Sequence, residues 1–197
     1  MPRSSREDAA RTRAAVASSA ADLASAEGLA SVSLGRIAEQ IGISKSGVIG
    51  PFRSKEELQL ATLRAAAERF RAEVWEPAAD LEPGIERLRG VMEAWFSYLE
   101  RDVFPGGCFL TAAAHEFDGR PGRVRDAIAR TWELWLGVLE AEARTAQEAG
   151  ALSRDRSARQ VALELNALAM SANMAKQLHG WPDPTAHARE AAGRVLG

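Results

Sequence analysis

Two serine-lysine pairs stand where helices are expected to begin, and their chemistry suits the binding of an anion. Ser44 precedes Lys45, and Ser54 precedes Lys55. The first backbone N–H groups of a helix lie at the positive end of its dipole, where they attract phosphate oxygens. A lysine at the first helical position opposes that dipole and costs stability unless an anion lies nearby. Either lysine alone is better explained as a solvated surface residue, but two in one short tract indicate contact with a nucleic-acid backbone.

A third pair, Cys108 and His115, has the residue types of a thiol nucleophile and its general base. The two are seven residues apart and could share one face of a helix. The sequence fixes no orienting group or oxyanion donor for them, and alanines are frequent between them. We therefore expect no enzyme, and a buried structural cysteine is the preferred interpretation of Cys108.

The lysines lie within SVSLGRIAEQIGISKSGVIGPFRSKEEL, residues 31–58, whose spacing predicts three short capped helices. The expected N-caps are Ser33, Ser44 and Ser54. Gly42 supplies a left-handed stop for the first helix, and only one residue separates it from the next cap, so the link must be a sharp corner. Glu57 completes an S-x-x-E capping box at the third helix. This arrangement is typical of a helix-turn-helix.

The tract resembles the DNA-binding domain of the TetR family of transcriptional regulators. The matching residues are Ile37-Ala38, Ile41-Gly42-Ile43-Ser44-Lys45, Phe52 and Ser54-Lys55-Glu56-Glu57-Leu58, after a first helix that contains Val16, Ala20, Leu23 and Ala24 and closes at Gly28. The match covers the first quarter to third of the chain. It implies an all-α fold with a three-helix helix-turn-helix head over residues 1–56 and a larger helical effector-binding and dimerisation domain over residues 57–197. The chain departs from the family at Ile49-Gly50-Pro51, where aromatic residues and a histidine commonly hold backbone phosphates.

Positions within this head predict the residues that contact double-stranded DNA. The expected groove-facing residues are Ser44, Lys45, Ser46, Gly47 and Val48. The expected phosphate contacts are Ser33, Arg36 and Lys55. Arg3 and Arg6 are expected in a polar leader that could reach phosphates or a minor groove, although a disordered tail explains them equally well.

Charge and composition agree with one end that meets DNA. The formal net charge is -2, but residues 1–55 carry eight basic and five acidic side chains, which leaves the remainder at -5. A basic head on an acidic body suits a protein that presents one end to a polyanion. The sequence lacks the roughly 18 consecutive apolar residues of a membrane span and the apolar stretch of a secretory signal. Its single cysteine cannot form an internal disulfide, so we expect a cytoplasmic protein.

Beyond the head, apolar residues recur at helical spacing and strand signals are absent. The predicted helices run from Leu58 toward Trp75, from Ile85 to Leu99, from Cys108 to Phe117, from Val124 to near Gly150, and from about Ser157 to His179. The last of these is apolar on two sides, and its small residues permit close helix approach. We expect this helix and the one before it to pair with their copies in a homodimer, as the resemblance also implies; burial inside one subunit is the alternative.

Several bulky apolar or lone polar residues fall on helices expected to surround an effector cavity. The candidates are Met92, Trp95, Phe96, Phe109, His115, Trp132, Trp135, Met170, Asn173 and Met174. For each of them separately, plain core packing is the stronger interpretation. His115 and Glu116 are adjacent and point to different sides of a helix, so no metal site and no cofactor are indicated.

The sequence thus predicts a DNA-binding transcriptional regulator. Because most members of the family that it resembles are repressors, we expect a repressor that a small, mostly hydrophobic ligand releases from a near-palindromic operator. Binding of that ligand is expected to swing the long helix that begins near Leu58 and to change the spacing of the paired recognition helices. Two alternatives remain: a TetR-like fold whose altered Ile49-Gly50-Pro51 corner makes it a ligand- or protein-binding module, and the much less favoured enzyme using Cys108 and His115.

Overall fold

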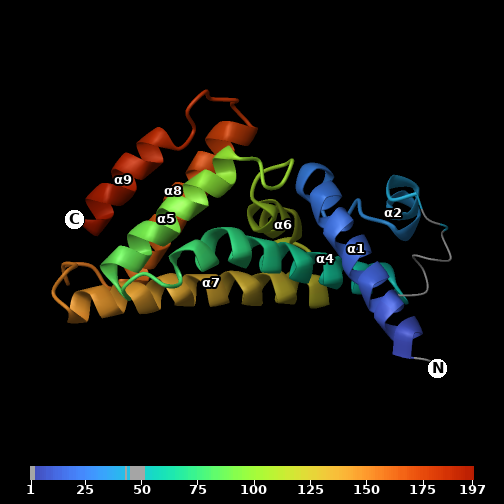
Figure 1. Ribbon diagram of the computed structural model, residues 1–197. Helices are drawn as coiled ribbons and strands as arrows, with labels where there is room; N and C mark the ends of the chain where they lie inside the picture. The colour runs from blue at the N-terminus through green and yellow to red at the C-terminus, as the bar shows by residue number, and fades with distance from the viewer. Residues whose placement is uncertain (1–2, 43, 45–51) are drawn as a thin grey trace. The chain divides into compact units, whose positions relative to one another are not determined.

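The computed structural model describes residues 3–42, 44 and 52–197, and within the first helix it describes side chains from residue 9 onward. Every regular element of these residues is helical (Figure 1), which confirms the predicted fold class. The first elements are α1 (Arg3–Glu27), α2 (Leu34–Gln40), α4 (Lys55–Phe70), the π-helical η1 (Arg71–Trp75) and the 3-10 turn η2 (Glu76–Ala78). The others are α5 (Ile85–Glu100), α6 (Phe109–Phe117), α7 (Arg123–Glu148), α8 (Ala158–Gln177) and α9 (Ala186–Leu196).

The chain forms two compact units, and each is built from two stretches of sequence. Unit 1 contains residues 1–68 and 104–129, and unit 2 contains residues 69–103 and 130–197. Segment 104–129 therefore belongs to the same unit as α1 and α2, and α4 and α7 each contribute residues to both units. The functional division at residue 56 stays a prediction.

The start of α2 has the caps that the sequence predicts. The hydroxyl of Ser33 accepts a hydrogen bond from the N–H of Arg36 at 3.3 Å. Val32 and Ile37, five residues apart on either side of the cap, are both fully buried in a hydrophobic staple. Gly42 has φ +68, the left-handed conformation expected after the helix. Local sequence signals thus account for both ends of α2.

The start of α4 uses the predicted capping residues in a slightly different way. Ser54 Oγ accepts from the N–H of Glu57 at 3.1 Å, as an N-cap does. Glu57 Oε2 accepts from the N–H of Arg53 at 3.0 Å, one residue before the N–H used in a standard capping box. Leu58 follows and is fully buried, which fixes the orientation of the first turn of α4.

The N-terminal segment differs from the prediction. Helix α1 begins at Arg3, so Arg3 and Arg6 belong to the helix rather than to a polar leader before it. Their side chains lie outside the described part of the chain. The helix packs on α2 and α6 within unit 1. Its alanine-rich sequence favours helix strongly enough to extend the element beyond the apolar stripe on which the prediction was based.

In unit 2, α5, α8 and α9 pack against one another in pairs (Figure 1). Helix α9 is not among the predicted elements. Its buried positions include Ala188 and Ala192, whose small side chains make a weak hydrophobic pattern. It starts where Asp183 Oδ1 accepts from the N–H of Ala186 at 3.1 Å. Its contacts with α5 and α8 explain why this short helix is stable despite that weak pattern.

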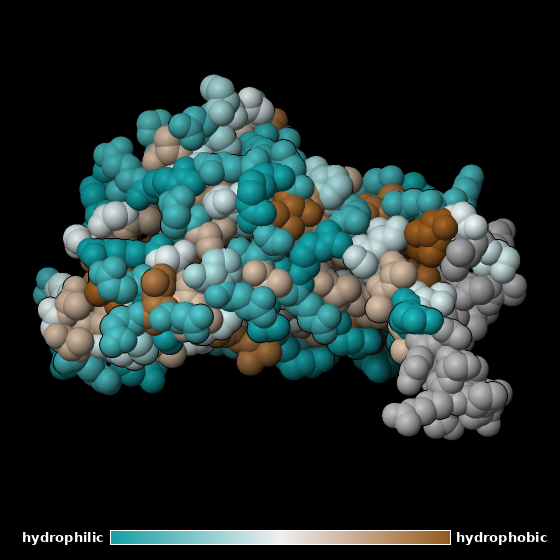
Figure 2. All heavy atoms as spheres, viewed as in Figure 1, coloured by the Kyte–Doolittle hydropathy of each residue, from teal (hydrophilic) through white to brown (hydrophobic). Residues whose placement is uncertain are grey.

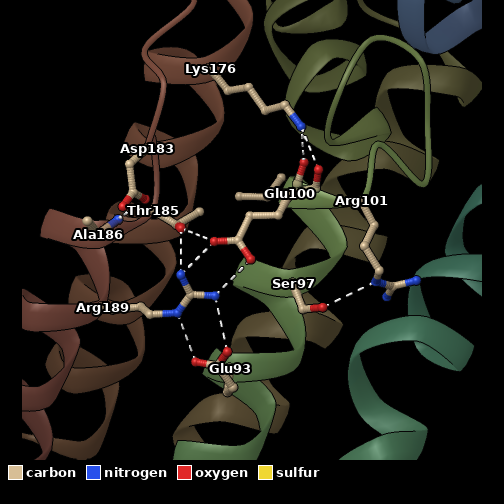
Figure 3. Close-up of polar contacts among 10 residues, drawn as sticks. Glu93, Ser97, Glu100, Arg101, Lys176, Asp183, Thr185, Ala186 and Arg189 are labelled. Carbon is tan, nitrogen blue, oxygen red and sulfur yellow. Dashed lines mark hydrogen bonds and ion pairs between the residues drawn. The ribbon is translucent and has the colours of Figure 1, made fainter.

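One arginine joins α9 to α5 (Figure 3). The guanidinium of Arg189 donates to both carboxylate oxygens of Glu100, at 2.5 and 3.0 Å, and to both of Glu93, at 2.9 and 3.1 Å. It also donates to Thr185 Oγ1 at 2.7 Å. Hydrogen bonding from Arg189 lowers the pKa of Glu100, helped by Thr185 and opposed by partial burial. The carboxylates in turn raise the pKa of Arg189. This is an oriented, charge-assisted network rather than a loose surface pair.

A lysine on α8 caps the C-terminal end of α5 (Figure 3). Lys176 Nζ donates to the backbone oxygens of Leu99 and Glu100, at 2.6 and 3.0 Å. It also pairs with Asp102 at 2.7 Å. A cation at the C-terminus of a helix satisfies the last carbonyl groups and opposes the negative end of the dipole. The C-terminal end of α5 is therefore held by polar contacts from both α8 and α9.

The start of α5 is held by a buried acid on α7. Glu142 accepts from the N–H of Gly84 at 2.7 Å and pairs with Arg87 at 3.1 Å. Gly84 has φ +97, and a Cβ there would lie 3.1 Å from the backbone nitrogen of Ala146. The glycine is therefore required both by its conformation and by the close approach of α7.

Among the described residues, no helix contains an apolar stretch long enough to span a membrane. Hydrophilic side chains cover most of the face shown in Figure 2, and hydrophobic side chains form separate spots on it.

Candidate nucleic-acid interface and effector core

Most of the predicted recognition helix lies outside the residues that the structure describes. Lys45, Ser46, Gly47 and Val48 lie outside the described residues, as does the unusual Ile49-Gly50-Pro51 corner. Ser44 is described and exposed. The structure therefore bears on the flanks of the proposed DNA contact, which are α2 and the start of α4.

The three predicted phosphate contacts are at the surface of unit 1, and each has an intramolecular partner. Ser33 caps α2, as described above. Arg36 pairs with Glu27 at 2.5 Å, and both side chains are more than two-fifths exposed. Lys55 Nζ donates to the backbone oxygen of Ala30 and is exposed. Exposed pairs of this kind are weak, so a phosphate can compete for either cation.

The turn between α1 and α2 is fixed from two other helices of unit 1. Glu116 on α6 accepts from the N–H of Ala30, with Oε1 at 3.0 Å and Oε2 at 3.2 Å. Lys55 on α4 binds the carbonyl of the same residue, and Gln59 Nε2 donates to the oxygen of Leu29 at 3.0 Å. Because α2 follows directly, these contacts set the position from which the helix-turn-helix starts.

A glycine makes this approach possible. Gly28 has φ +87, and a Cβ built on it would lie 3.0 Å from Glu116 Oε1. The sequence identified Gly28 as the end of α1 but not as a contact of α6. Gly106 is similarly close to the end of α1, because a Cβ there would lie 2.0 Å from the oxygen of Ser25. The end of α1 therefore packs tightly on the segment from Gly106 to Glu116.

Four aromatic side chains form a cluster in unit 2, which we call the aromatic cluster: Phe70, Trp95, Tyr98 and Trp135. Phe70 of α4 meets Trp95, Tyr98 and Trp135 edge to face, with ring centroids 5.3, 5.4 and 4.9 Å away. Trp95 of α5 and Trp135 of α7 meet at 5.2 Å, with planes 82° apart. Such geometry is favourable for aromatic pairs. Trp95 and Trp135 were predicted candidates, whereas Phe70 and Tyr98 were not.

Two donors in this cluster are buried without an acceptor. The indole N–H groups of Trp95 and Trp135 are both inaccessible, and neither has a hydrogen-bond partner in the described part of the chain. Buried indole N–H groups usually find a partner. A buried donor without an acceptor costs about 1–3 kcal/mol of stability. The two indole N–H groups are therefore unsatisfied donors in the core of unit 2.

The other predicted ligand residues are more dispersed. In unit 2, Met92, Phe96 and Asn173 are buried, Trp132 is half-buried, and Met170 accepts a weak bond from Asn166 at 3.1 Å. Met174 is exposed on α8. Phe109 and His115 belong to α6 in unit 1, where Phe109 packs on Phe104 and exposed His115 bonds to the oxygen of Thr111. Of the predicted set, Trp95 and Trp135 are in direct ring contact.

Cys108 and His115 lie in different surroundings. Cys108 is the buried N-cap of α6, whereas the ring of His115 is exposed and its Nδ1 lies 2.8 Å from the oxygen of Thr111 on the same helix. No group of three metal-binding side chains occurs among the described residues. The geometry of α6 therefore offers nothing in favour of the thiol-histidine pair.

Exposed apolar side chains follow one of the two apolar sides that the sequence predicts for α8 and its C-cap, Leu178. Its large members are Leu163, Met174 and Leu178, and Leu178 is 71% exposed. On α7, Leu134 is 73% exposed, and a Cβ on the nearby Gly137 would meet only open space. Arg159 of α8 joins the two helices through Glu133 and Glu140. Two neighbouring helices thus both present apolar or small residues to solvent.

Two family models match the chain over most of its length. Residues 17–62 match the bacterial regulatory proteins of the tetR family. Residues 84–192, more than half of the chain, match the tetracyclin repressor-like C-terminal domain.

The chain belongs to the TetR family. Its fold and its N-terminal and C-terminal domains are those of a TetR-family transcriptional regulator. The N-terminal model spans α2 and the start of α4, which confirms the family that the sequence motifs indicate.

Solved TetR-family structures resemble the whole chain. A regulator from Chloroflexus aurantiacus J-10-FL is 25% identical, with a TM-score of 0.87 and coverage of 96% of both chains. A regulator from Cytophaga hutchinsonii is 20% identical, with a TM-score of 0.82 over 96% of this chain and 94% of that one. AibR, solved with isovaleryl coenzyme A and operator DNA, is 20% identical, with a TM-score of 0.75 over 94% and 98%. No curated protein matches.

Proposed function

We propose that this TetR-family protein represses transcription by binding a near-palindromic operator as a homodimer, and that a small, mostly hydrophobic ligand releases it. The observation that carries the proposal is the union, in one chain, of the tetR-type N-terminal domain with the tetracyclin repressor-like C-terminal domain. AibR, which has the same fold, was solved with both operator DNA and an acyl coenzyme A. A ligand and an operator for the present chain are proposed by analogy with that pairing.

DNA binding is proposed through the helix-turn-helix and its flanks. The exposed Lys55 and Arg36 have weak partners that a phosphate can replace. Ser44 and the undescribed residues 45–48 are proposed to face the base edges. The residues on the flanks supply affinity that is independent of sequence, and the recognition segment supplies selectivity.

Homodimerisation is proposed through α7 and α8. The exposed side chains of Leu134 and Leu163 belong to neighbouring helices, and a second copy that covers both would remove two apolar stripes from water. Two such helices from each subunit form a four-helix contact. A dimer also has a functional reason, because one recognition helix reads too few base pairs for selective binding.

Helix α4 is the proposed link between effector and operator. It begins at Lys55, beside the helix-turn-helix, and ends at Phe70, in the aromatic cluster. A ligand that moves Phe70 therefore acts on the same continuous helix that carries Lys55 and Gln59. If the two recognition helices leave the spacing of about 34–36 Å between successive major grooves, operator affinity falls.

A gel shift with DNA from upstream of the protein's own gene tests the proposal. We expect the purified protein to retard that fragment at low ionic strength and to ignore a scrambled fragment of equal length. We also expect small hydrophobic molecules that raise its melting temperature to weaken the complex. Ligand binding without any selective DNA complex would contradict the proposal and would favour a binding module whose head is altered at Ile49-Gly50-Pro51.

A further inference from the structure

We propose that the aromatic cluster binds an uncharged, flat, apolar effector through a carbonyl or ether oxygen that accepts from the indole N–H of Trp95 or Trp135. The inference rests on the proposed function, because it names the class of its ligand. It goes further in assigning the contact to two particular N–H groups.

The first argument is the polarity of the cluster. Trp95 is 97% buried, and the Nε1 atoms of Trp95 and Trp135 are both inaccessible and without an acceptor in the described part of the chain. The two rings lie 5.2 Å apart and come from different helices, α5 and α7. A core that needed only ring packing could use phenylalanine at either position without stranding a donor. An acceptor that enters between these helices satisfies what the protein leaves unpaired.

The second argument concerns charge. Glu142 is the buried carboxylate of unit 2 among the described residues, and it is already neutralised by Arg87 and by the N–H of Gly84. The groups in the cluster are donors and ring faces rather than formal charges. A carboxylate or ammonium placed among them would be desolvated without a buried counter-ion, at a cost far above that of a neutral carbonyl. The geometry therefore favours an uncharged guest.

The third argument is the backbone beside Phe70. The α-helical pattern of α4 ends at Phe70, and the next five residues, Arg71–Trp75, form a π-helical segment. Such segments are rare and are frequently found at functional sites. Phe70 touches three other members of the aromatic cluster, so a guest that displaces one ring acts on the last residue of α4 at a point where the regular helix already ends.

Three naphthalene derivatives of similar shape form the probe set. The ketone 2-acetylnaphthalene carries one neutral acceptor, 2-ethylnaphthalene has none, and 2-naphthoate carries a charged carboxylate. Dissociation constants are measured on the full-length protein by calorimetry. We expect the ketone to bind about 2- to 10-fold more tightly than the hydrocarbon, which corresponds to one buried hydrogen bond, and the carboxylate to bind most weakly.

Substitutions Trp95→Phe and Trp135→Phe keep a ring and remove the donor. We expect at least one of them to abolish the preference for the ketone while binding of 2-ethylnaphthalene changes little. Trp181→Phe is the matched control, because Trp181 is exposed and lies outside the aromatic cluster. The chain has five tryptophans, so nitrogen-15 NMR shows few indole signals, and each substitution assigns one of them. The signal lost in the affected variant should shift when the ketone is added to the wild-type protein.

Three kinds of result would overturn the proposal. One is a lack of ketone preference, seen either as equal affinity for the ketone and the hydrocarbon or as no binding of any of the three probes. Another is tighter binding of 2-naphthoate, which would assign a charged ligand. A third is an unchanged ketone preference in both variants together with lower stability of the ligand-free protein, as expected if each N–H points at a neighbouring ring face. Operator binding is measured separately. Selective DNA binding without probe selectivity would contradict this ligand class but not the proposed repressor. Probe selectivity without selective DNA binding would support the ligand class and contradict the proposed repressor.

Discussion

The carboxylate of Glu116 on α6 accepts the backbone N–H of Ala30 through both of its oxygens, at 3.0 and 3.2 Å. Eighty-six residues separate the two positions in sequence. Ala30 lies in the turn that leads into α2, and Lys55 of α4 binds its carbonyl oxygen. One peptide unit beside the helix-turn-helix is thus held by side chains from two other helices. Contacts of this kind position a DNA-reading element without touching DNA.

Removal of the Glu116 side chain is expected to loosen this turn. Glu116→Ala leaves the N–H of Ala30 without its acceptor and should lower the free energy of unfolding by about 1–3 kcal/mol. It should also weaken operator binding, because the start of α2 is less well defined. Glu116→Gln keeps an acceptor oxygen and should behave almost like the wild type in chemical denaturation and gel shift. Equal losses in both variants would show that charge, rather than the bond to Ala30, is what matters.

The close approach of Gly28 to Glu116 gives a second test. Gly28→Ala introduces a Cβ 3.0 Å from Oε1 in a residue with φ +87, whereas Gly42→Ala introduces one at φ +68 with no atom within 4 Å. Both variants should lose about 1–2 kcal/mol from the left-handed conformation. Only Gly28→Ala should lose roughly a further 1 kcal/mol as the carboxylate is displaced from Ala30. The extra loss should disappear in the Glu116→Ala background, and its persistence there would contradict the proposed contact.

Lys55 has two expected roles that salt dependence can separate. Loss of a phosphate contact in Lys55→Ala should weaken binding to all DNA sequences alike and reduce the slope of log affinity against log salt by about 0.9. Loss of the bond to Ala30 should lower the melting temperature slightly. Fluorescence anisotropy at several salt concentrations measures the first, and calorimetry the second. A lowered melting temperature with an unchanged salt slope would assign Lys55 to the turn alone.

Local sequence signals predicted the helix ends well because caps act over a few residues. Ser33, Ser54 and Gly42 each have the predicted role, and the helix that includes Phe70 continues toward Trp75 as expected. The change to π-helix at Arg71 was not predicted, since one helical turn with an extra residue leaves the apolar spacing almost unchanged.

Contacts between distant residues could not be predicted in the same way. Glu116 follows His115 on a short helix, and nothing near it in sequence indicates that its partner is Ala30. Phe70 falls within the helix that the sequence predicts from Leu58 toward Trp75, but its three ring partners come from α5 and α7. Helix α9 was missed because alanine contributes little to hydrophobic periodicity. Each of these features depends on tertiary packing, which a single sequence does not specify locally.

Acid should selectively weaken the attachment of α9 to α5. Because the folded-state pKa of Glu100 is lowered from its usual value of 4.5, its pairing with Arg189 stabilises the protein fully above that value and is lost as the pH falls through the folded pKa. Glu100→Gln should therefore cost about 0.5–1 kcal/mol at pH 7 and progressively less as the solution is acidified. Urea denaturation at pH 7, 5 and 3 measures the difference from the wild type.

The matched control for this network is Glu190→Gln on the same helix. Glu190 pairs with Arg194 one turn away, and both side chains are about two-thirds exposed. Its substitution should change stability by no more than a few tenths of a kcal/mol at any of the three pH values. A pH-independent loss in Glu100→Gln would mean that the ionised carboxylate is not the source of the stabilisation.

The exposed face of α7 and α8 predicts which leucines hold a dimer together. Leu163 is 47% exposed and Leu81 is 41% exposed, but only Leu163 lies on the apolar face of α8. Leu163→Glu should convert a dimeric protein to monomers in light scattering at micromolar concentration, because each interface would contain two desolvated carboxylates. Leu81→Glu, the same change outside that face, should leave the mass unchanged.

Loss of the dimer should also abolish selective operator binding, since a single head reads too few base pairs. A wild-type protein that is monomeric at this concentration would reject the proposed interface, and a dimer that tolerates both Leu163→Glu and Leu134→Glu would place it elsewhere on the molecule.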